Sequence, residues 1–526
     1  MTALVALDFD MQEKVFAFLA DPVTHGNTPV QRIDTHAASV FLAGARALKI
    51  KRAVRFPFLD YSTLAKRKSA CEEEIKINRS FAPQIYLRVI PITRREDGTL
   101  SIDGHGEPVE WAVEMVRFDE RLTFDHIAEA GPPHRDLALK IADVIAASHA
   151  IAVRAVTDPW INSIPSIITR NTEAFRSMAS FAADDIDALD RASQSAFSRI
   201  RKLLEQRGQQ GLVRRCHGDL HLANIVLIEN KPVLFDAIEF DPLIASVDVL
   251  YDLAFVMMDF VHYERLGAAD IILNRYLATT SQDNLDALVS LPLFMSMRAA
   301  IRANVLLARL GQRGGDKELT QRTARDYFAL ARRLISPPAP KLVAIGGLSG
   351  TGKSVLAHAI ASFVEPLPGA VVLRSDITLK QKFQAHESDR LPAKAYRPEA
   401  TAEVYQILAK RAARVLSQGH SVIVDAVFAC EAERIAISKV ARDANLPFVG
   451  LFLSTDLATR MKRVGHRKGD ASEATPEIAQ LQEKYIIGQV DWVAIDASGT
   501  AEQTLNRGKA GLVSPERLAP DRNPTP

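Results

Sequence analysis

Three polar residues with a spacing suited to phosphoryl transfer lie in the middle of the chain. Asp219 is followed five residues later by Asn224, and Asp236 comes twelve residues after Asn224. Two short apolar runs, 225–228 and 233–235, predict a β-hairpin that holds these groups at its mouth. Asp219 could accept the proton of an attacking hydroxyl, while the oxygens of Asn224 and Asp236 suit Mg²⁺ beside nucleotide phosphates. A single Asp is more often a turn residue, but the full spacing favours a catalytic loop.

The same stretch resembles the aminoglycoside phosphotransferase family, which belongs to the wider protein-kinase-like fold. The likeness rests on three short motifs: His217-Gly218-Asp219 with Asn224, Phe235-Asp236, and Asp252-Leu253-Ala254. The resemblance implies that Asp219 is the catalytic base and that Asn224 and Asp236 bind the metal. It also implies structural roles for His217 and Asp252, with Asp252 buried and bracing the catalytic loop.

Length and composition limit the class of protein. A chain of 526 residues is too long for one ordinary domain and predicts about two to four. Apolar residues make up 47% and charged residues 24%, which is enough for globular cores. The net charge of +2 gives no reason to expect nucleic acid or an anionic membrane as a partner. The three cysteines lack metal-ligand spacing, which argues against a zinc site or a disulfide framework and fits a reducing cytoplasm.

Neither a signal peptide nor a membrane span is expected. The N-terminus carries Asp8 and Asp10 and has no basic region ahead of an apolar run. The most apolar run, 249–261, contains two Asp residues and is too short to cross a bilayer, so it predicts a buried helix.

The N-terminal region offers a phosphate-binding lysine and its partner. Residues 40–51 predict a hairpin, and Lys49 and Lys51 share one face of its second strand because side chains alternate with period two. Either lysine could reach a phosphate, and the kinase-like resemblance favours Lys49 for the α- and β-phosphates. A helix over 63–80 offers three consecutive acids as the ion-pair partner, and of these we favour Glu74.

Residues 1–334 predict an α+β, protein-kinase-like domain of two lobes. Strands are expected over 85–92 and 111–116, and the second ends in Glu114-Met115-Val116. By the same resemblance this is the hinge whose backbone binds adenine, so Glu114 and Met115 are candidate ATP contacts. No Gly-x-Gly-x-x-Gly loop precedes the lysine strand, which is a difference from protein kinases. From Asp136 onward the apolar periodicity is helical, as in a helical lobe.

A second domain is predicted over 341–505, after a Pro-rich linker at 335–340. Its first strand is followed by a loop of the form G-x-x-x-x-G-K-S and then by a helix, the order that a phosphate loop requires. Lys353 is expected to reach the β- and γ-phosphates and Ser354 to bind Mg²⁺, while backbone amides cradle the phosphates. The candidate ATP-binding residues are Gly347, Ser349, Gly350, Thr351, Gly352, Lys353 and Ser354.

Two further strands of this domain end in acids. Asp425 closes one as the Walker B acid that binds the metal, and Asp376 closes the other at the sheet edge, where an acceptor would bind. Three candidate lid arginines, Arg460, Arg463 and Arg467, lie along one predicted helix and its exit, and we expect Arg463 and Arg467 to neutralise charge on the transferring phosphoryl group. Residues 506–526 form a Pro-containing tail that is predicted to be disordered.

The second domain is similar to small-molecule P-loop kinases of the gluconate kinase, shikimate kinase and zeta-toxin type. Its predicted fold class is α/β with a parallel sheet. The whole chain resembles bacterial proteins that join a phosphotransferase-like domain to an AAA-type ATP-binding domain.

Together these patterns predict a cytoplasmic enzyme that uses ATP and Mg²⁺ and phosphorylates small-molecule hydroxyls at one site per domain. Nothing in the sequence indicates the acceptors or the oligomeric state. An alternative is that the N-terminal domain is a nucleotide-binding regulatory or substrate-binding module beside an active P-loop kinase. Antibiotic phosphorylation follows only by analogy of fold, although Glu239, Asp241 and Asp248 add negative charge near the expected cleft, compatible with a cationic acceptor.

Overall fold

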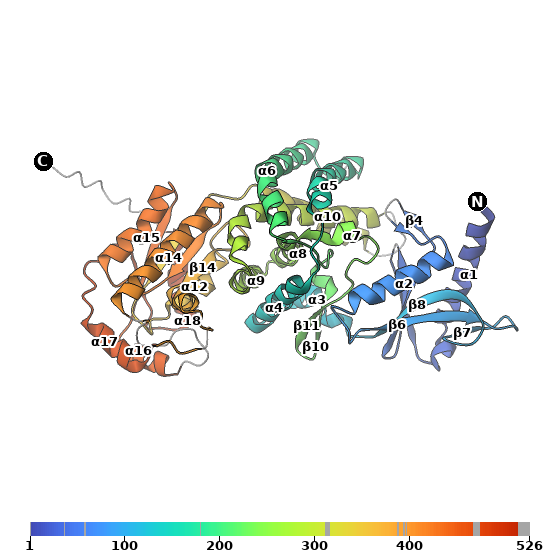
Figure 1. The fold of residues 1–526 in the computed structure, drawn as a ribbon, viewed down its shortest axis with the longest axis horizontal. Helices are drawn as coiled ribbons and strands as arrows, with labels where there is room; N and C mark the ends of the chain where they lie inside the picture. The colour runs from blue at the N-terminus through green and yellow to red at the C-terminus, as the bar shows by residue number, and fades with distance from the viewer. Residues whose placement is uncertain are drawn as a thin grey trace. The chain divides into compact units, whose positions relative to one another are not determined.

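The fold is that of a computed structural model, drawn in Figure 1. The residues described are 2–35, 37–56, 59–178, 180–310, 316–386, 389–392, 395, 397–466 and 474–513, without the side chains of 2–9, 282 and 283. The chain divides into two compact units. The first comprises Met1–Ile167 and Arg201–Asp259, and the second comprises Ile168–Ile200 and Phe260–Pro526.

The first unit contains an antiparallel sheet of six strands in the order β1-β2-β3-β8-β6-β7. These strands are β1 (Val30–Asp34), β2 (Ala38–Ala43), β3 (Arg46–Lys51), β6 (Tyr86–Arg94), β7 (Leu100–Ile102) and β8 (Glu107–Val116). The predicted hairpin over 40–51 is confirmed, because β2 and β3 pair in antiparallel register. Gly44 starts its turn with φ 58°, a left-handed conformation that glycine adopts without strain.

Alternation along β3 directs its side chains to two different helices. Leu48 packs in the apolar cluster that contains residues of α1 (Thr2–Ala20). Lys49 and Lys51 face the other side, where both contact Glu74 of α2 (Leu64–Asn78). Figure 1 shows α2 lying along the sheet beside β6 and β8. The period of two along β3 therefore separates an apolar core from a charged face.

The second predicted hairpin is also confirmed. β10 (Ile225–Ile228) pairs with β11 (Lys231–Leu234), and the two turn residues, Glu229 and Asn230, have φ 48° and 60°. Positive φ at both positions is the turn form that matches the twist of hairpin strands. The predicted buried helix is α8 (Val249–His262), whose residues 249–261 are all buried.

Shorter elements and further helices complete this part of the chain. They are β4 (Arg55–Phe56), β5 (Leu59–Asp60), α3 (Phe124–Ala130), α4 (Arg135–Ile151), α5 (Thr157–Met178), α6 (Ala183–Gln209), β9 (Val213–Arg215), α7 (Pro242–Ala245) and β12 (Ser246–Asp248). The single-turn helices are Pro22–His25, Glu120–Leu122 and Leu222–Asn224.

The second unit contains a parallel sheet of five strands in the order β14-β15-β13-β16-β17. They are β13 (Leu342–Gly346), β14 (Val371–Arg374), β15 (Val422–Asp425), β16 (Phe448–Ser454) and β17 (Val493–Asp496). β13 is buried along its whole length, which explains its continuous apolar run. The predicted fold classes, α+β followed by α/β with a parallel sheet, are thereby confirmed.

Helices cover this sheet and extend before it in sequence. They are α9 (Leu266–Thr279), α10 (Leu291–Arg309), α11 (Lys317–Ile335), α12 (Lys353–Ala361), α13 (Ser375–Lys382), α14 (Pro398–Ser417), α15 (Glu431–Asp443), α16 (Leu457–Gly465), α17 (Pro476–Leu481) and α18 (Ala501–Val513). Two 3-10 segments are Gln282–Ser290 and Gln482–Lys484. α18 extends to Val513, so the prediction of disorder is wrong for 506–513, where Gly508 and Gly511 lie close against Leu356 and Leu451. The rest of the expected tail, 514–526, lies outside the described residues.

Within the described part of the chain, one helical stretch, 284–309, is long and apolar enough to cross a membrane by length and composition. Its most apolar window is 61% buried inside the protein, and core helices of soluble proteins pass the same test.

Candidate active sites

The first site brings a lysine and two acids together from three separate elements. Lys49 Nζ of β3 lies 2.8 Å from Glu74 Oε1 of α2 and 2.6 Å from Asp236 Oδ1, two residues after β11. Glu74 is fully buried, whereas Glu72 and Glu73 pair with exposed lysines of their own helix. The structure thus brings together the lysine and the acid that the sequence analysis favours.

Lys51 belongs to the same network. Its Nζ lies 2.6 Å from Glu74 Oε2 and also pairs with Glu239, whose carboxylate accepts a hydrogen bond of 3.3 Å from the Tyr61 hydroxyl. Sequence reasoning left Lys51 as an alternative to Lys49 and did not find its contact with Glu239. That contact joins residues 188 positions apart, and no local pattern signals it.

Opposite charges keep this network ionised despite its burial. Burial lowers the pKa of Lys49, but Asp236 and then Glu74 outweigh it and hold that pKa well above its ordinary value. Burial raises the pKa of Glu74, but Lys49 and Lys51 bring it below its ordinary value. The pKa of Asp236 is lowered in the same way, mainly by Lys49 acting against burial. The group is therefore charged throughout the neutral range.

The proposed base lies in an open position on the neighbouring loop. Asp219 has a side chain 43% exposed, and Asn224 Nδ2 donates a 2.9 Å hydrogen bond to its backbone carbonyl. The same amide lies 3.4 Å from Asp219 Oδ2, and His221 Nε2 lies 3.4 Å from that oxygen. Asp219 and Asn224 are thus held next to each other, and the carboxylate remains accessible to an acceptor.

Asp252 lies beneath this loop and is fully buried. Its Oδ1 accepts a 2.9 Å hydrogen bond from Gly218 N, and its Oδ2 lies 3.2 Å from His149 Nε2. His217 Nε2 lies 2.9 Å from the Phe235 carbonyl oxygen, which links the loop to the strand that precedes Asp236. Burial lowers the pKa of His217, so the ring is neutral and donates to that carbonyl. Sequence reasoning missed His149, because nothing near it in the chain marks it as a partner of Asp252.

The expected hinge lies within the sheet. Glu114 stands opposite Leu48 on β3, and Met115 stands opposite Ala47. The Glu114 carboxylate pairs with Arg46 at 2.6 Å and with Arg88 at 2.9 Å, and its backbone lies between β3 and β6, so a contact with adenine stays a prediction.

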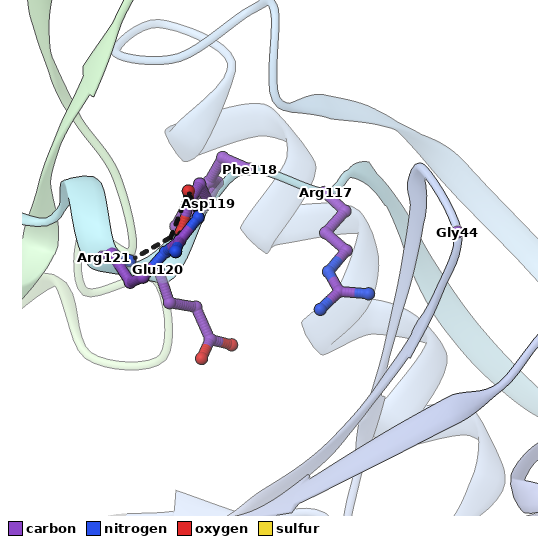
Figure 2. Close-up of a pocket in the computed structure, with 6 residues that line it drawn as sticks. All are labelled: Gly44, Arg117, Phe118, Asp119, Glu120 and Arg121. Atoms are coloured by element: carbon purple, nitrogen blue, oxygen red, sulfur yellow. Dashed lines mark hydrogen bonds and ion pairs between the residues drawn. The ribbon is translucent and has the colours of Figure 1, made fainter.

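The segment that follows β8 lines a cavity of about 490 Å³. Figure 2 shows its lining residues: Gly44, Arg117, Phe118, Asp119, Glu120 and Arg121. Arg121 pairs with Asp119 at 2.7 Å, while Arg117 and Glu120 extend into the open space beside them (Figure 2). The sequence analysis did not single out this segment, since its composition is that of an ordinary polar loop.

The three acids expected to attract a cationic acceptor are held by internal partners. Asp248 is fully buried and pairs with Arg207 at 2.6 Å and 2.8 Å. Glu239 is buried against Lys51, and Asp241 accepts the capping hydrogen bond of α7 from Leu243 N at 2.8 Å. The interpretation of these residues as an acceptor-attracting cluster is wrong, because their charge is used to hold the fold.

The second site is built on the loop between β13 and α12. Gly352 is the N-cap of α12 with φ 94°, and Gly347 has φ 136°. A side chain at Gly350 would meet the Arg460 backbone at 2.6 Å, so the close approach there requires glycine. Such a loop points its backbone amides at the N-terminus of a helix, where phosphates bind favourably.

The hydroxyl and the acid that are expected to bind the metal lie in contact. Ser354 Oγ lies 2.5 Å from Asp425 Oδ2, at the carboxyl end of β15. Lys353 Nζ donates a 3.2 Å hydrogen bond to the Leu348 carbonyl, across the mouth of the loop. Thr351 Oγ1 donates to the same carbonyl at 2.8 Å, and Ser349 N donates to Gln482 Oε1 at 2.7 Å. The hydroxyl and carboxylate oxygens are ligands that Mg²⁺ prefers.

The remaining candidates lie around this edge of the sheet. β14 ends at Arg374 and Asp376 is in the first turn of α13, so the prediction that Asp376 closes the strand is wrong, although it lies two residues past the strand end. Arg463 is in the last turn of α16, and its Nη2 donates a 2.9 Å hydrogen bond to the Gly499 carbonyl, between β17 and α18. Arg467 lies outside the described residues. A role for Arg463 and Arg467 in charge neutralisation stays a prediction.

Comparison with known proteins agrees with the two-part organisation. A family model described as an AAA domain matches residues 342–485. An uncharacterized protein of Mycobacterium tuberculosis is 28% identical over 486 residues, which cover 90% of this chain and 93% of that protein, and one of Mycobacterium bovis matches equally. The sheet topologies confirm the predicted order, an α+β part followed by an α/β part with a parallel sheet, and the AAA match lies within the second part.

Two solved structures are similar to separate parts of the chain. A choline/ethanolamine kinase family protein from Mesorhizobium loti is 16% identical with a TM-score of 0.38, covering 62% of this chain and 96% of that one. A gluconokinase from Sinorhizobium meliloti is 20% identical with a TM-score of 0.24, covering 33% of this chain and 91% of that one.

Replacing Glu74 should destabilise the first unit and weaken its hold on a nucleotide. Glu74→Gln leaves the buried Lys49 and Lys51 without one of their carboxylates, and breaking a buried ion pair costs about 3–5 kcal/mol. Hydrogen exchange of α2 and β3 should be faster in the variant, and nucleotide affinity should fall. Glu73→Gln is the matched control, since its exposed pair with Lys76 is worth less than about 1 kcal/mol. Equal protection in the two variants would contradict the role of Glu74.

Proposed function

We propose that this chain is an ATP-dependent phosphotransferase with two Mg-ATP sites, each of which transfers the γ-phosphoryl group to a hydroxyl of a small molecule. The observation that carries the proposal for the first site is the joint contact of Lys49 with Glu74 and Asp236, beside the exposed carboxylate of Asp219. For the second site it is the contact of Ser354 with Asp425 below the phosphate loop.

In the first site, Lys49 would hold the α- and β-phosphates, with its direction fixed by Glu74. Asn224 and Asp236 would hold Mg²⁺, which neutralises phosphate charge when it is bound. Asp219 would orient the acceptor hydroxyl and take its proton as the oxygen bonds to the γ-phosphorus and the bond to the ADP oxygen breaks. The 43% exposure of the Asp219 side chain supports this role, because a base must be reachable from the acceptor side. Backbone groups near Glu114 and Met115 would contact the adenine.

In the second site, the amides of the phosphate loop and Lys353 would hold the β- and γ-phosphates. Ser354 and Asp425 would hold Mg²⁺, and Asp376 would orient the acceptor hydroxyl. Arg463 and Arg467 would neutralise developing charge. Catalysis of this kind needs positioning and charge stabilisation, which these residue types supply. The proposal includes a cytoplasmic location and small hydroxyl-bearing substrates.

The number of nucleotides bound per chain tests the proposal. Titration calorimetry with a non-hydrolysable ATP analogue and Mg²⁺ should give two sites for the wild type. Lys49→Met should lose one of them, because it removes a charge-assisted contact to phosphate. Lys66→Met is the control, because Lys66 is an exposed lysine that pairs with Asp60. This variant should keep both nucleotide sites. A single site in the wild type would reject the two-site proposal.

A further inference from the structure

An arginine that the sequence analysis passed over lies at the second site. Arg374 is the last residue of β14 and stands directly opposite Asp425 in the parallel register of β14 and β15. Its Nε lies 3.4 Å from Asp425 Oδ2, and its Nη2 lies 4.0 Å from Asp376 Oδ2. Both strands end at the carboxyl edge of the sheet, where open α/β folds bind their ligands. The guanidinium is thus between the two acids expected to bind the metal and the acceptor.

The position is inside the site and not on the protein surface. The Arg374 side chain is 13% exposed, and the Asp425 side chain is 4% exposed. Ser354 Oγ lies 2.5 Å from the same Asp425 oxygen that Arg374 approaches. A guanidinium, a hydroxyl and two carboxylates therefore converge near the phosphate loop. This loop follows β13, which is the neighbour of β15 in the sheet.

Metal and guanidinium would compete for one carboxylate. A divalent cation held by Asp425 and Ser354 would repel the Arg374 guanidinium, whose Nε lies 3.4 Å from the same Asp425 oxygen. Besides the Asp376 carboxylate, which lies 4.0 Å from Arg374 Nη2, the phosphate oxygens that would arrive with the metal could receive the displaced guanidinium. Arginine suits them because its planar fork donates two parallel hydrogen bonds to a phosphoryl group.

Other arginines of this part of the chain are held elsewhere. Arg434 donates to the carbonyls of Phe428, Ala429, Ile487 and Gln489. Arg460 is buried and pairs with Glu483. The contacts of these two arginines build the domain, whereas the two ion pairs described for Arg374 are with acids of the site.

We propose that Arg374 is a catalytic residue of the P-loop site, which pairs with Asp425 in the nucleotide-free protein and binds the transferring phosphoryl group when Mg-ATP is bound. This inference rests on the phosphotransferase function proposed for the P-loop part. Arg374 would stabilise charge on the oxygens of the γ-phosphoryl group during transfer, a task that Lys353 would begin at the β- and γ-phosphates.

Two measurements on the full chain test the role of Arg374, in an Asp219→Asn background that silences the first site. Steady-state ATP turnover should show a kcat about 100-fold lower in Arg374→Ala, with a KM for ATP changed less than about 3-fold. Mn²⁺ binding without nucleotide, followed by electron paramagnetic resonance, should be tighter in Arg374→Ala, because the competing guanidinium is gone.

Two further variants serve as controls. Arg374→Lys keeps the positive charge but lacks the planar guanidinium, so its kcat should fall at least about 10-fold while its Mn²⁺ affinity stays near wild type. Arg442→Ala, an exposed arginine of α15, should change neither quantity.

The outcomes separate this inference from the function on which it rests. Lys353→Ala is measured in parallel. If Lys353→Ala loses one of the two ATP sites and Arg374→Ala keeps a kcat within about 3-fold of its parent, the inference alone is overturned. It is also overturned if KM rises while kcat and Mn²⁺ affinity stay unchanged, since that pattern marks a uniform loss of binding. If Lys353→Ala binds ATP as the wild type does, the P-loop function and the inference both fail.

Discussion

Asp219→Asn should abolish phosphoryl transfer at the first site and leave nucleotide binding there intact. The amide keeps the shape of the side chain but cannot take the proton of the acceptor hydroxyl. General bases contribute about 10²- to 10⁴-fold to rate, so acceptor-dependent turnover should fall by about 10³-fold. The Asp219 side chain is 43% exposed and Asn has nearly the same size and shape, so the fold should tolerate the change.

The measurement is acceptor-dependent ADP formation together with calorimetric nucleotide binding, in a Lys353→Ala background that silences the second site. Asp241→Asn is the matched control, because Asp241 caps α7 and Asn caps a helix equally well. It should keep full turnover. Turnover in Asp219→Asn within about 3-fold of its parent would remove Asp219 from the mechanism.

Lys353→Ala should remove ATP from the second site. The Lys353 ammonium lies across the mouth of the phosphate loop, where it donates to the Leu348 carbonyl at 3.2 Å. A charge-assisted hydrogen bond contributes about 1.5–3 kcal/mol, which predicts a loss of affinity of about 10- to 150-fold for the ground state alone. The loss in turnover should be larger, since charge on the phosphoryl oxygens grows in the transition state.

Calorimetry with an ATP analogue in a Lys49→Met background reports this site by itself. Lys439→Ala is the control, because Lys439 is exposed on α15 and pairs with Asp443 four residues later. Affinity for the analogue that is equal in Lys353→Ala and in the control would contradict the assignment of the phosphate loop.

The residues that sequence reasoning found are those whose roles appear in local spacing. The hairpin between Asn224 and Asp236 follows from two apolar runs and a short turn, and the phosphate loop from a strand, glycines and a helix in order. The choice of Lys49 and Glu74 also depended on the resemblance to kinase-like proteins. Lys51 lies on the same face of β3 as Lys49, and Glu73 is adjacent to Glu74 in the sequence. The structure explains why both lysines look alike, because both contact Glu74.

The residues that sequence reasoning missed act through contacts between distant parts of the chain. His149 meets Asp252 across 103 positions, and Lys51 meets Glu239 across 188. Asp248 was interpreted as a surface acid, although its partner Arg207 lies 41 positions earlier and buries it. Arg374 has no local signal in the sequence, and the pairing of β14 with β15 sets it opposite Asp425. These contacts depend on which helices and strands pack or pair with each other. Periodicity within a single helix or strand does not predict them.

The central claim is that the chain carries two separate phosphoryl-transfer sites. The most direct test is acceptor-dependent ATP turnover by purified wild type, Asp219→Asn and Lys353→Ala, each assayed against pooled sugars, nucleosides, polyols and aminoglycosides. We predict that each substitution removes a different acceptor-dependent activity and leaves the other in place. If Lys353→Ala removes every activity and Asp219→Asn removes none, the N-terminal part is a binding or regulatory module and the two-site account is wrong.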